Sequence, residues 1–233
     1  MLVQRFHPGI QLGQQPTLVH SGKSLFSRQG HWDGGSALHC IAMALALQGT
    51  LADPVNLPEQ QSGNGRVLWD HAWPHYLHGL TVSEVVSFIA ELDLGIRPLV
   101  RTGQVAVIVD FITRELSAGH PVIVGLRQRP NPSQHQGHAA GRHAALVVGI
   151  EGHQLGRRFE PRALLLLDPA GNKPGLAGFN VRLDPQGIDL QGISPQGSTR
   201  VRYQSSGNAQ TVNRMRSIND ASLRVHAVGA WTV

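Results

Sequence analysis

A long apolar segment runs from Ser36 to Gln48, and it is apolar nearly all the way round when it is read as a helix. Most of its residues favour helices, with a serine at its start and Gly49 just past its end. A helix without a polar face is typical of the interior of a domain. The pattern therefore predicts a buried helix over residues 36–48.

Two further segments carry apolar residues at helical spacing. Residues 81–94 begin with Thr-Val-Ser-Glu, which has the form of a capping box. Residues 105–118 form a second amphipathic pattern, which is closed by Gly119. Both segments are predicted to be helices.

Residues 67–79 are rich in aromatic side chains and are interrupted by Pro74, so a short helix or a turn is expected there. We expect three aromatic side chains of this segment in the core, with the lining of a substrate groove as the alternative. They are Trp69, Trp73 and Tyr76.

After Pro121 the pattern changes to short apolar runs that are typical of strands. The clearest runs are residues 122–126, 144–150 and 162–168, and the weaker ones are residues 179–183, 201–204 and 224–233. Before the helices, residues 17–20 can form a further short strand. Residues 127–142 are rich in Gln, His, Pro and Gly and predict a loop. Helices followed by a largely antiparallel sheet indicate the α+β class. We expect a single domain over residues 1–233, in which the C-terminal strands complete the sheet.

Composition and charge narrow the class of protein. The chain contains 27 Gly and 14 Pro, and only 15% of its residues are charged, which favours a loop-rich α+β domain over a helical bundle. The net charge is +5, but the arginines are scattered and are not interleaved with aromatic residues, so a nucleic-acid partner is not expected. Cys40 is the only cysteine, which excludes an internal disulfide.

The N-terminal residues lack a basic region followed by an apolar run, and no window is apolar over the length of a membrane span. We therefore expect a cytoplasmic protein without a membrane segment or a signal peptide. Export by a specialised system stays open.

Three separated residues lie at element boundaries that suit acyl transfer. Ser36 opens the buried helix, where free N–H groups and the positive end of the helix dipole stabilise a thiolate or an oxyanion. His143 directly precedes one predicted strand, and Asp168 ends the next. If these strands pair as a hairpin, Asp168 comes close to His143 and can orient its imidazole, as the third member of a triad does.

The arrangement resembles the papain-like cysteine peptidases, and more closely the bacterial double-glycine leader peptidases and their stand-alone relatives. The motifs are Gln29-Gly-x-x-Asp-Gly-Gly-Ser36, His143-Ala-x-x-Val-x-Gly149 and Leu-Leu-Asp168-Pro169-x-Gly171. The likeness covers roughly residues 25–175. It implies a papain-like fold that hydrolyses peptide or isopeptide bonds of a peptide or protein substrate through a Cys/His/Asp triad, without a cofactor. By the same resemblance Gln29 supplies a side-chain oxyanion donor, and the backbone N–H of Ser36 supplies the second.

The family has a cysteine where this chain has Ser36. The serine can be an engineered, inactivating replacement, the mark of a natural pseudoenzyme that binds a partner without cleavage, or a working nucleophile. A fourth interpretation makes Cys40, one turn deeper on the same helical face, the nucleophile. A hydroxyl needs stronger base activation than a thiol, and a cysteine among apolar neighbours is usually inert. We favour an inactivating serine in a thiol-hydrolase site, with the pseudoenzyme as the alternative.

The same residues suit deamidation or transamidation as well as cleavage. Leader processing, toxicity toward a rival cell and removal of a ubiquitin-like modifier are all compatible with them. The predicted chemistry is therefore acyl transfer from an amide, with peptide cleavage as the leading form.

Several histidines have spacings that can suit metal ligands. They are His71, His75, His78, His135 and His138. Pro74 breaks the helix that would align His71 with His75, and the chain has no HExxH motif. We therefore expect no metal site.

Overall fold

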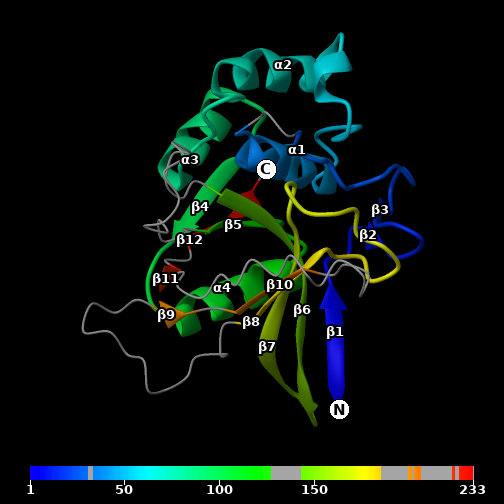
Figure 1. Cartoon of the computed structure of the whole chain (residues 1–233), viewed down its shortest axis with the longest axis vertical. Coiled ribbons are helices and arrows are strands. Elements are labelled where there is room, and N and C mark those ends of the chain that lie inside the picture. Colours follow the sequence, from blue (N-terminus) through cyan, green and yellow to red (C-terminus); the bar gives the residue numbers. More distant parts are fainter. Residues whose placement is uncertain are drawn as a thin grey trace, which may run out of the picture.

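The fold is built on an antiparallel sheet with a buried helix on one face and a second helix on the other (Figure 1). The computed structural model describes residues 1–30, 34–126, 143–184, 199–200, 202–205, 222–223 and 226–232. The helices are α1 (Ser36–Leu47), α2 (Gly63–Ala72), α3 (Val82–Glu91) and α4 (Val105–Ser117), with 3₁₀ turns at Leu57–Glu59 and Trp73–His75.

The main sheet has the strand order β10-β8-β7-β6-β5-β12-β4, and every neighbouring pair is antiparallel. Its strands are β4 (Arg97–Arg101), β5 (Val122–Leu126), β6 (His143–Leu155), β7 (Arg158–Leu167), β8 (Val181–Asp184), β10 (Arg202–Ser205) and β12 (His226–Thr232). β1 (Leu2–Phe6) pairs with the second half of β6. β2 (Ile10–Gln11) pairs with β3 (Thr17–Leu18), and β9 (Thr199–Arg200) pairs with β11 (Ser222–Leu223).

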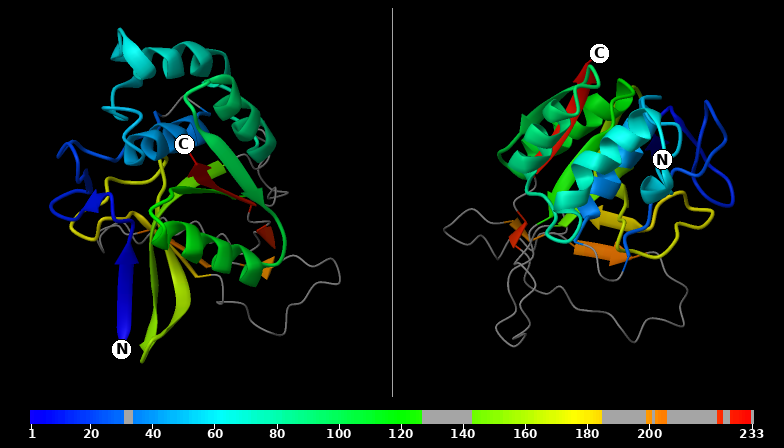
Figure 2. Two further views of the ribbon diagram at one scale, coloured as in Figure 1. Left: turned by 180° about the vertical axis from the view of Figure 1, so that it is seen from behind. Right: turned by 90° about the horizontal axis from the view of Figure 1, so that it is seen from above.

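The predicted helix over residues 36–48 is α1, and all twelve of its residues are buried. It packs against the face of the sheet that carries Leu146, Leu165 and Leu167, while α2 and α3 cover its other side (Figure 2). Because no side of this helix faces solvent, none of its faces needs polar residues, which explains why residues 36–48 are apolar nearly all the way round.

β6 and β7 are buried on both faces over residues 144–152 and 163–167, because α4 covers the face opposite α1. Leu146 and Val148 face α1, whereas Val147 and Ile150 belong to the cluster around α4. The register of β6 against β7 shifts between Val147 and Gly149, where a β-bulge lies. The apolar runs in these strands are therefore continuous and not alternating.

The α+β class is confirmed, with an N-terminal buried helix and further helices packed on an antiparallel sheet. The capping box at Thr81 is also confirmed, since Thr81 Oγ1 accepts the Glu84 N–H and the Glu84 carboxylate accepts the Thr81 N–H.

Two expectations need correction. β1 and β4 lie before or among the helices, so the chain does not place all helices first. Trp73 is 66% exposed and is not a core residue, although Trp69 and Tyr76 do pack against the core. An exposed ring is possible there because the 3₁₀ turn that begins at Trp73 has no buried residue.

The expected loop over residues 127–142 lies outside the described residues, and so do His135 and His138. No helix in the described part of the chain has both the length and the apolar character of a membrane span.

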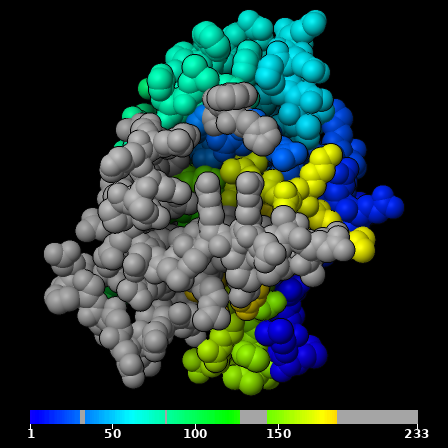
Figure 3. Space-filling view, in the orientation of Figure 1, coloured from blue at the N-terminus to red at the C-terminus, as the bar shows by residue number. Residues whose placement is uncertain are grey.

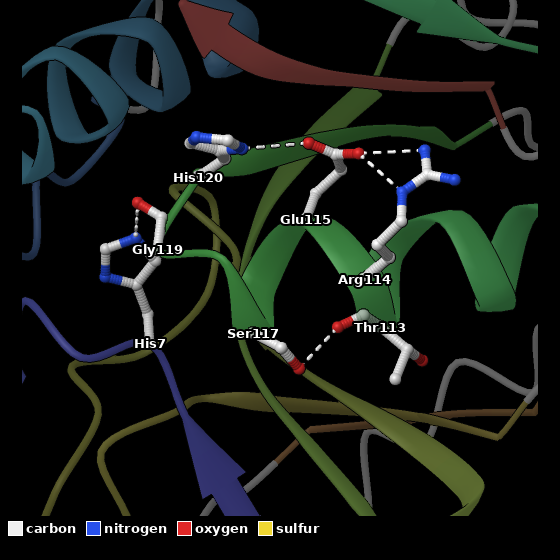
Figure 4. A network of polar contacts seen from close by, with 7 residues as sticks. All are labelled: His7, Thr113, Arg114, Glu115, Ser117, Gly119 and His120. Carbon is white, nitrogen blue, oxygen red and sulfur yellow. Dashed lines mark hydrogen bonds and ion pairs between the residues drawn. The ribbon is translucent and has the colours of Figure 1, made fainter.

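A polar network fastens the end of β1 to the turn between α4 and β5 (Figure 4). His7 is 3% exposed; its Nδ1 accepts the Gly9 N–H at 3.0 Å, and its Nε2 lies 2.8 Å from the Gly119 carbonyl oxygen. Since a carbonyl only accepts, Nε2 carries the proton and the ring is neutral. Glu115 in turn binds His120 at 3.0 Å and Arg114 at 2.9 Å. The network fixes the turn from which β5 starts.

Protonation of His7 should destabilise the fold. Burial lowers the pKa of His7 and nearby His120 lowers it further, although the Gly119 hydrogen bond acts in the opposite direction. The unfolded chain, with an ordinary histidine pKa of about 6.5, therefore binds the proton first as the pH falls. We expect the free energy of unfolding in urea to fall between about pH 7 and about pH 5, and the fall to shrink in His7→Gln. The exposed His20 serves as the control: His20→Gln should keep the full pH dependence, and an equal dependence in His7→Gln would contradict the assignment.

Candidate active site

Ser36 is the first residue of α1, and Gly35 is the N-cap. Among the described residues, no side chain caps this end of the helix. The Ser36 hydroxyl instead turns toward the sheet, where Oγ accepts the backbone N–H of Ala144 at 3.1 Å. The residue is 2% exposed. Ser36 is therefore not an N-cap serine, and its hydroxyl lies where a helix N-terminus meets the start of β6.

His143 and Asp168 meet across the β6–β7 hairpin. The register pairs Leu146 with Leu167, so the start of β6 and the end of β7 share one end of the sheet. His143 Nε2 lies 2.9 Å from Asp168 Oδ1, with side-chain exposures of 22% and 5%. The hairpin expected from the sequence is thus confirmed, and it brings the two side chains together.

The orientation of the imidazole follows from this contact. Asp168 holds Nε2, which leaves Nδ1 as the nitrogen that can face another group. Ala144, whose N–H reaches Ser36 Oγ, is the direct neighbour of His143. Position 36 therefore lies against the backbone that carries the imidazole.

Gln29 also reaches this end of the sheet. Its backbone N–H donates to the Pro169 carbonyl at 2.9 Å, which joins the segment before α1 to the turn after Asp168. Figure 3 shows the yellow part of the chain, which includes this turn, next to blue N-terminal residues. The structure thus brings all four candidate residues, Gln29, Ser36, His143 and Asp168, to one end of the sheet.

Cys40 has the properties of an inert core thiol. It is fully buried. Burial raises the pKa of Cys40 well above the ordinary thiol value, and the Asp168 carboxylate raises it further. A nucleophilic cysteine needs a lowered pKa, which is the opposite of the shift at Cys40. The geometry therefore argues against the interpretation in which Cys40 is the nucleophile.

Two glycines hold the segment that leads into Ser36. Gly34 donates its N–H to the Tyr76 carbonyl at 3.0 Å. A Cβ on Gly34 would lie 2.5 Å from the Leu77 carbonyl oxygen, and a Cβ on Gly79 would lie 2.5 Å from the Gly34 carbonyl oxygen. The two backbones can approach this closely only because neither residue has a side chain.

Sequence reasoning missed Asn180, whose side chain binds the backbone of the turn at residues 168–172. Asn180 precedes β8 and is 0% exposed. Asparagine before a strand is common, since it suits turns. Only the three-dimensional arrangement distinguishes this one.

The metal hypothesis finds no support among the described residues, where no group of three His, Cys, Asp or Glu side chains could hold an ion. Pro74 lies in the 3₁₀ turn that directly follows α2. His71 binds the Val67 carbonyl at 2.9 Å, and His75 packs against the Phe88 ring.

No protein-family model and no curated protein matches the chain. Among solved structures, it is similar to UfSP from C. elegans, with a TM-score of 0.40 and 12% identity. The match covers 100% of this chain and 37% of the UfSP chain. A similarity of this degree identifies no family, so the function is argued from the site itself.

Proposed function

We propose that the chain carries the site of a cysteine-peptidase-like hydrolase that acts on peptide or isopeptide bonds, with Ser36 at the nucleophile position. The observation that carries the proposal is the His143–Asp168 pair, 2.9 Å apart, beside the N-terminus of the buried helix α1. The Ala144 N–H bond to Ser36 Oγ links these two parts of the site. The sequence motifs that resemble those of the leader peptidases point in the same direction.

With a thiol at position 36, the site suits covalent catalysis. Asp168 holds Nε2 of His143, so that Nδ1 takes the thiol proton and the imidazolium stabilises the thiolate. The thiolate attacks the amide carbonyl, and His143 then protonates the leaving amine. Water hydrolyses the resulting thioester with His143 as the base. Gln29 and the first N–H groups of α1 are the proposed donors to the oxyanion.

Ser36 makes this form of the chain a weak catalyst. A hydroxyl is almost never ionised near neutral pH, so it depends on complete proton removal during attack, whereas a thiol is already partly ionised. An ion pair that suits a thiolate gives the hydroxyl little help. We therefore expect the Ser36 form to bind its substrate and to turn it over slowly or not at all.

The second candidate is a natural pseudoenzyme that recognises a peptide or protein without cutting it. The observation that favours it is the state of Ser36, which is 2% exposed and whose hydroxyl accepts the Ala144 N–H. Both candidates share the same site. They differ in whether a thiol at position 36 restores chemistry.

Selective alkylation of a Ser36→Cys chain tests the proposal without a known substrate. Iodoacetamide is small enough for a confined site, and peptide mass spectrometry separates the new thiol at position 36 from Cys40. We expect the new thiol to react at about pH 6, where an ordinary thiol with a pKa of about 8.5 is almost fully protonated. Cys40 should stay unmodified in both the Ser36 chain and the substituted chain until they are unfolded.

Two results would count against the proposal. Labelling of Cys40 in the folded chain would favour the interpretation in which Cys40, and not position 36, is the nucleophile. A thiol at position 36 that reacts no faster than the thiol of a simple peptide would mean that the site does not activate a nucleophile.

A further inference from the structure

We infer that Asn180 is a positioning residue of this site, which holds the Asp168 carboxylate toward His143. The inference rests on the proposed function for its catalytic meaning. Its structural part, that Asn180 sets the direction of the Asp168 side chain, stands on the geometry alone.

The Asp168 carboxylate is directed by a tight turn. Its Oδ1 accepts the Ala170 N–H at 2.9 Å, and the same oxygen lies 2.9 Å from His143 Nε2. The Gly171 N–H donates to the Asp168 carbonyl at 3.0 Å. An aspartate that bonds the N–H two residues on is an Asx-turn, in which side chain and backbone must be placed together.

Asn180 holds that turn by three hydrogen bonds. Its Oδ1 accepts the Asp168 N–H at 2.7 Å, and its Nδ2 donates to the carbonyls of Asp168 and Asn172, both at 2.8 Å. The backbone N–H of Asn180 donates to the Leu166 carbonyl at 3.1 Å, which anchors the residue beside β7. Both protons of the amide group are therefore used, and the residue is 0% exposed.

The consequence for Asp168 is specific. The peptide groups on both sides of its Cα are held, the N–H by Oδ1 and the C=O by Nδ2 of one side chain. Since these two groups fix the backbone at Asp168, they also fix the direction in which its side chain leaves. The three side-chain hydrogen bonds of Asn180 thus form a clamp on the turn. The carbonyl of the next residue, Pro169, accepts the Gln29 N–H, so the clamp also helps to hold the segment that carries the proposed oxyanion donor.

Gly171 gives independent evidence that the clamp is closely fitted. A Cβ on Gly171 would lie 2.8 Å from Asn180 Nδ2 and 3.2 Å from the Asp168 carbonyl oxygen. Alanine at this position removes no hydrogen-bonding group but pushes against the amide. Gly171→Ala is therefore a mild way to disturb the same contact.

The first measurement uses the Ser36 chain. Asn180→Leu has a similar size and no charge, and it removes all three side-chain bonds. We expect the NMR signal of the His143 Nε2 proton, which the Asp168 bond protects from exchange, to be lost in Asn180→Leu and weakened in Gly171→Ala. Asn172→Ala is the control, because that side chain is exposed and the clamp uses only its backbone carbonyl.

The second measurement adds Ser36→Cys and follows alkylation of the new thiol at about pH 6. We expect a rate at least about tenfold lower with Asn180→Leu than with Asn172→Ala, since a rise of one in the thiol pKa removes about nine-tenths of the thiolate. Circular dichroism checks that each variant is folded. If Asn180→Leu does not fold, Gly171→Ala decides both measurements.

The outcomes separate the two claims. If a folded Asn180→Leu chain keeps both the His143 signal and the alkylation rate at position 36, the inference about Asn180 is wrong. A second outcome is that Asn180→Leu loses the His143 signal, while the thiol of Ser36→Cys is unreactive even in the chain that keeps Asn180. In that case Asn180 does position Asp168, and the proposed function fails. Loss of both the signal and the rate supports the inference in full.

Discussion

Replacement of His143 by alanine should slow alkylation of the introduced thiol in the Ser36→Cys chain by about 100-fold at about pH 6. The imidazole lies 2.9 Å through Nε2 from Asp168 Oδ1, and we propose it as the group that accepts the thiol proton. Without it, the helix N-terminus and the Ala144 N–H are the groups in the described part of the chain that are left to stabilise the charge of the thiolate. Rates of carbamidomethylation, followed by mass spectrometry, measure the effect.

His153→Ala is the matched control, since His153 is exposed and lies on the same strand, β6. It should leave the rate unchanged. Asp168→Asn should give an intermediate loss, because the amide oxygen can still accept from Nε2 but has no charge to stabilise the imidazolium. Equal rates in the His143 and His153 variants would mean that the His143 imidazole does not activate the thiol.

Gly79→Ala should destabilise the fold more than any other single alanine at a glycine near the site. Gly79 has a φ of +68°, and its Cβ would lie 2.5 Å from the Gly34 carbonyl oxygen. The positive φ alone costs roughly 1–2 kcal/mol with a side chain, and the clash adds about 1–3 kcal/mol. Because Gly34 and Gly35 lead directly into Ser36, the shift should also slow alkylation of a thiol placed at position 36.

Gly22→Ala separates the two contributions. Gly22 has the same φ of +68°, but a Cβ there would meet nothing within 4 Å. Urea unfolding should therefore show the backbone cost in both variants and the additional loss in Gly79→Ala alone. Equal losses would mean that the contact between Gly34 and Gly79 is not tight.

The parts of the fold with a strong local signal could be predicted from the sequence. α1 is apolar on all sides because it is enclosed, and the runs of β5, β6 and β7 are continuous because helices cover both faces of the sheet. His143 and Asp168 could be paired because they flank consecutive strands. That step needed only the assumption of a hairpin, which the register of β6 and β7 confirms.

The missed strands lack such a signal. β4 contains Pro98 at the edge of the sheet and is mostly exposed, so it has no apolar pattern. β1 is held partly by polar groups, since Gln4 binds Glu151 on β6 at 2.9 Å. The insertion of β12 between β5 and β4 joins segments that are distant in the sequence, which no local pattern encodes.

In the site, too, some features have a local sequence signal and others do not. The sequence could place Ser36 at the start of a helix, but it could not show that Gly35 is the cap or that the hydroxyl turns to Ala144. Asn180 lies 12 residues beyond Asp168, and its role depends on how the intervening loop closes. Contacts of this kind depend on the folded chain and have no spacing that can be recognised beforehand.

The most direct test of the central claim, that residues 36, 143 and 168 form a thiol-hydrolase site, is an ultraviolet titration of the thiolate in Ser36→Cys. Because Cys40 is buried beside Asp168, its raised pKa keeps it protonated at neutral and acidic pH, so the titration there reports the thiol at position 36 alone. We expect a thiolate that forms well below the ordinary pKa of about 8.5. A thiol at position 36 that ionises at or above this value in the folded chain would contradict the central claim.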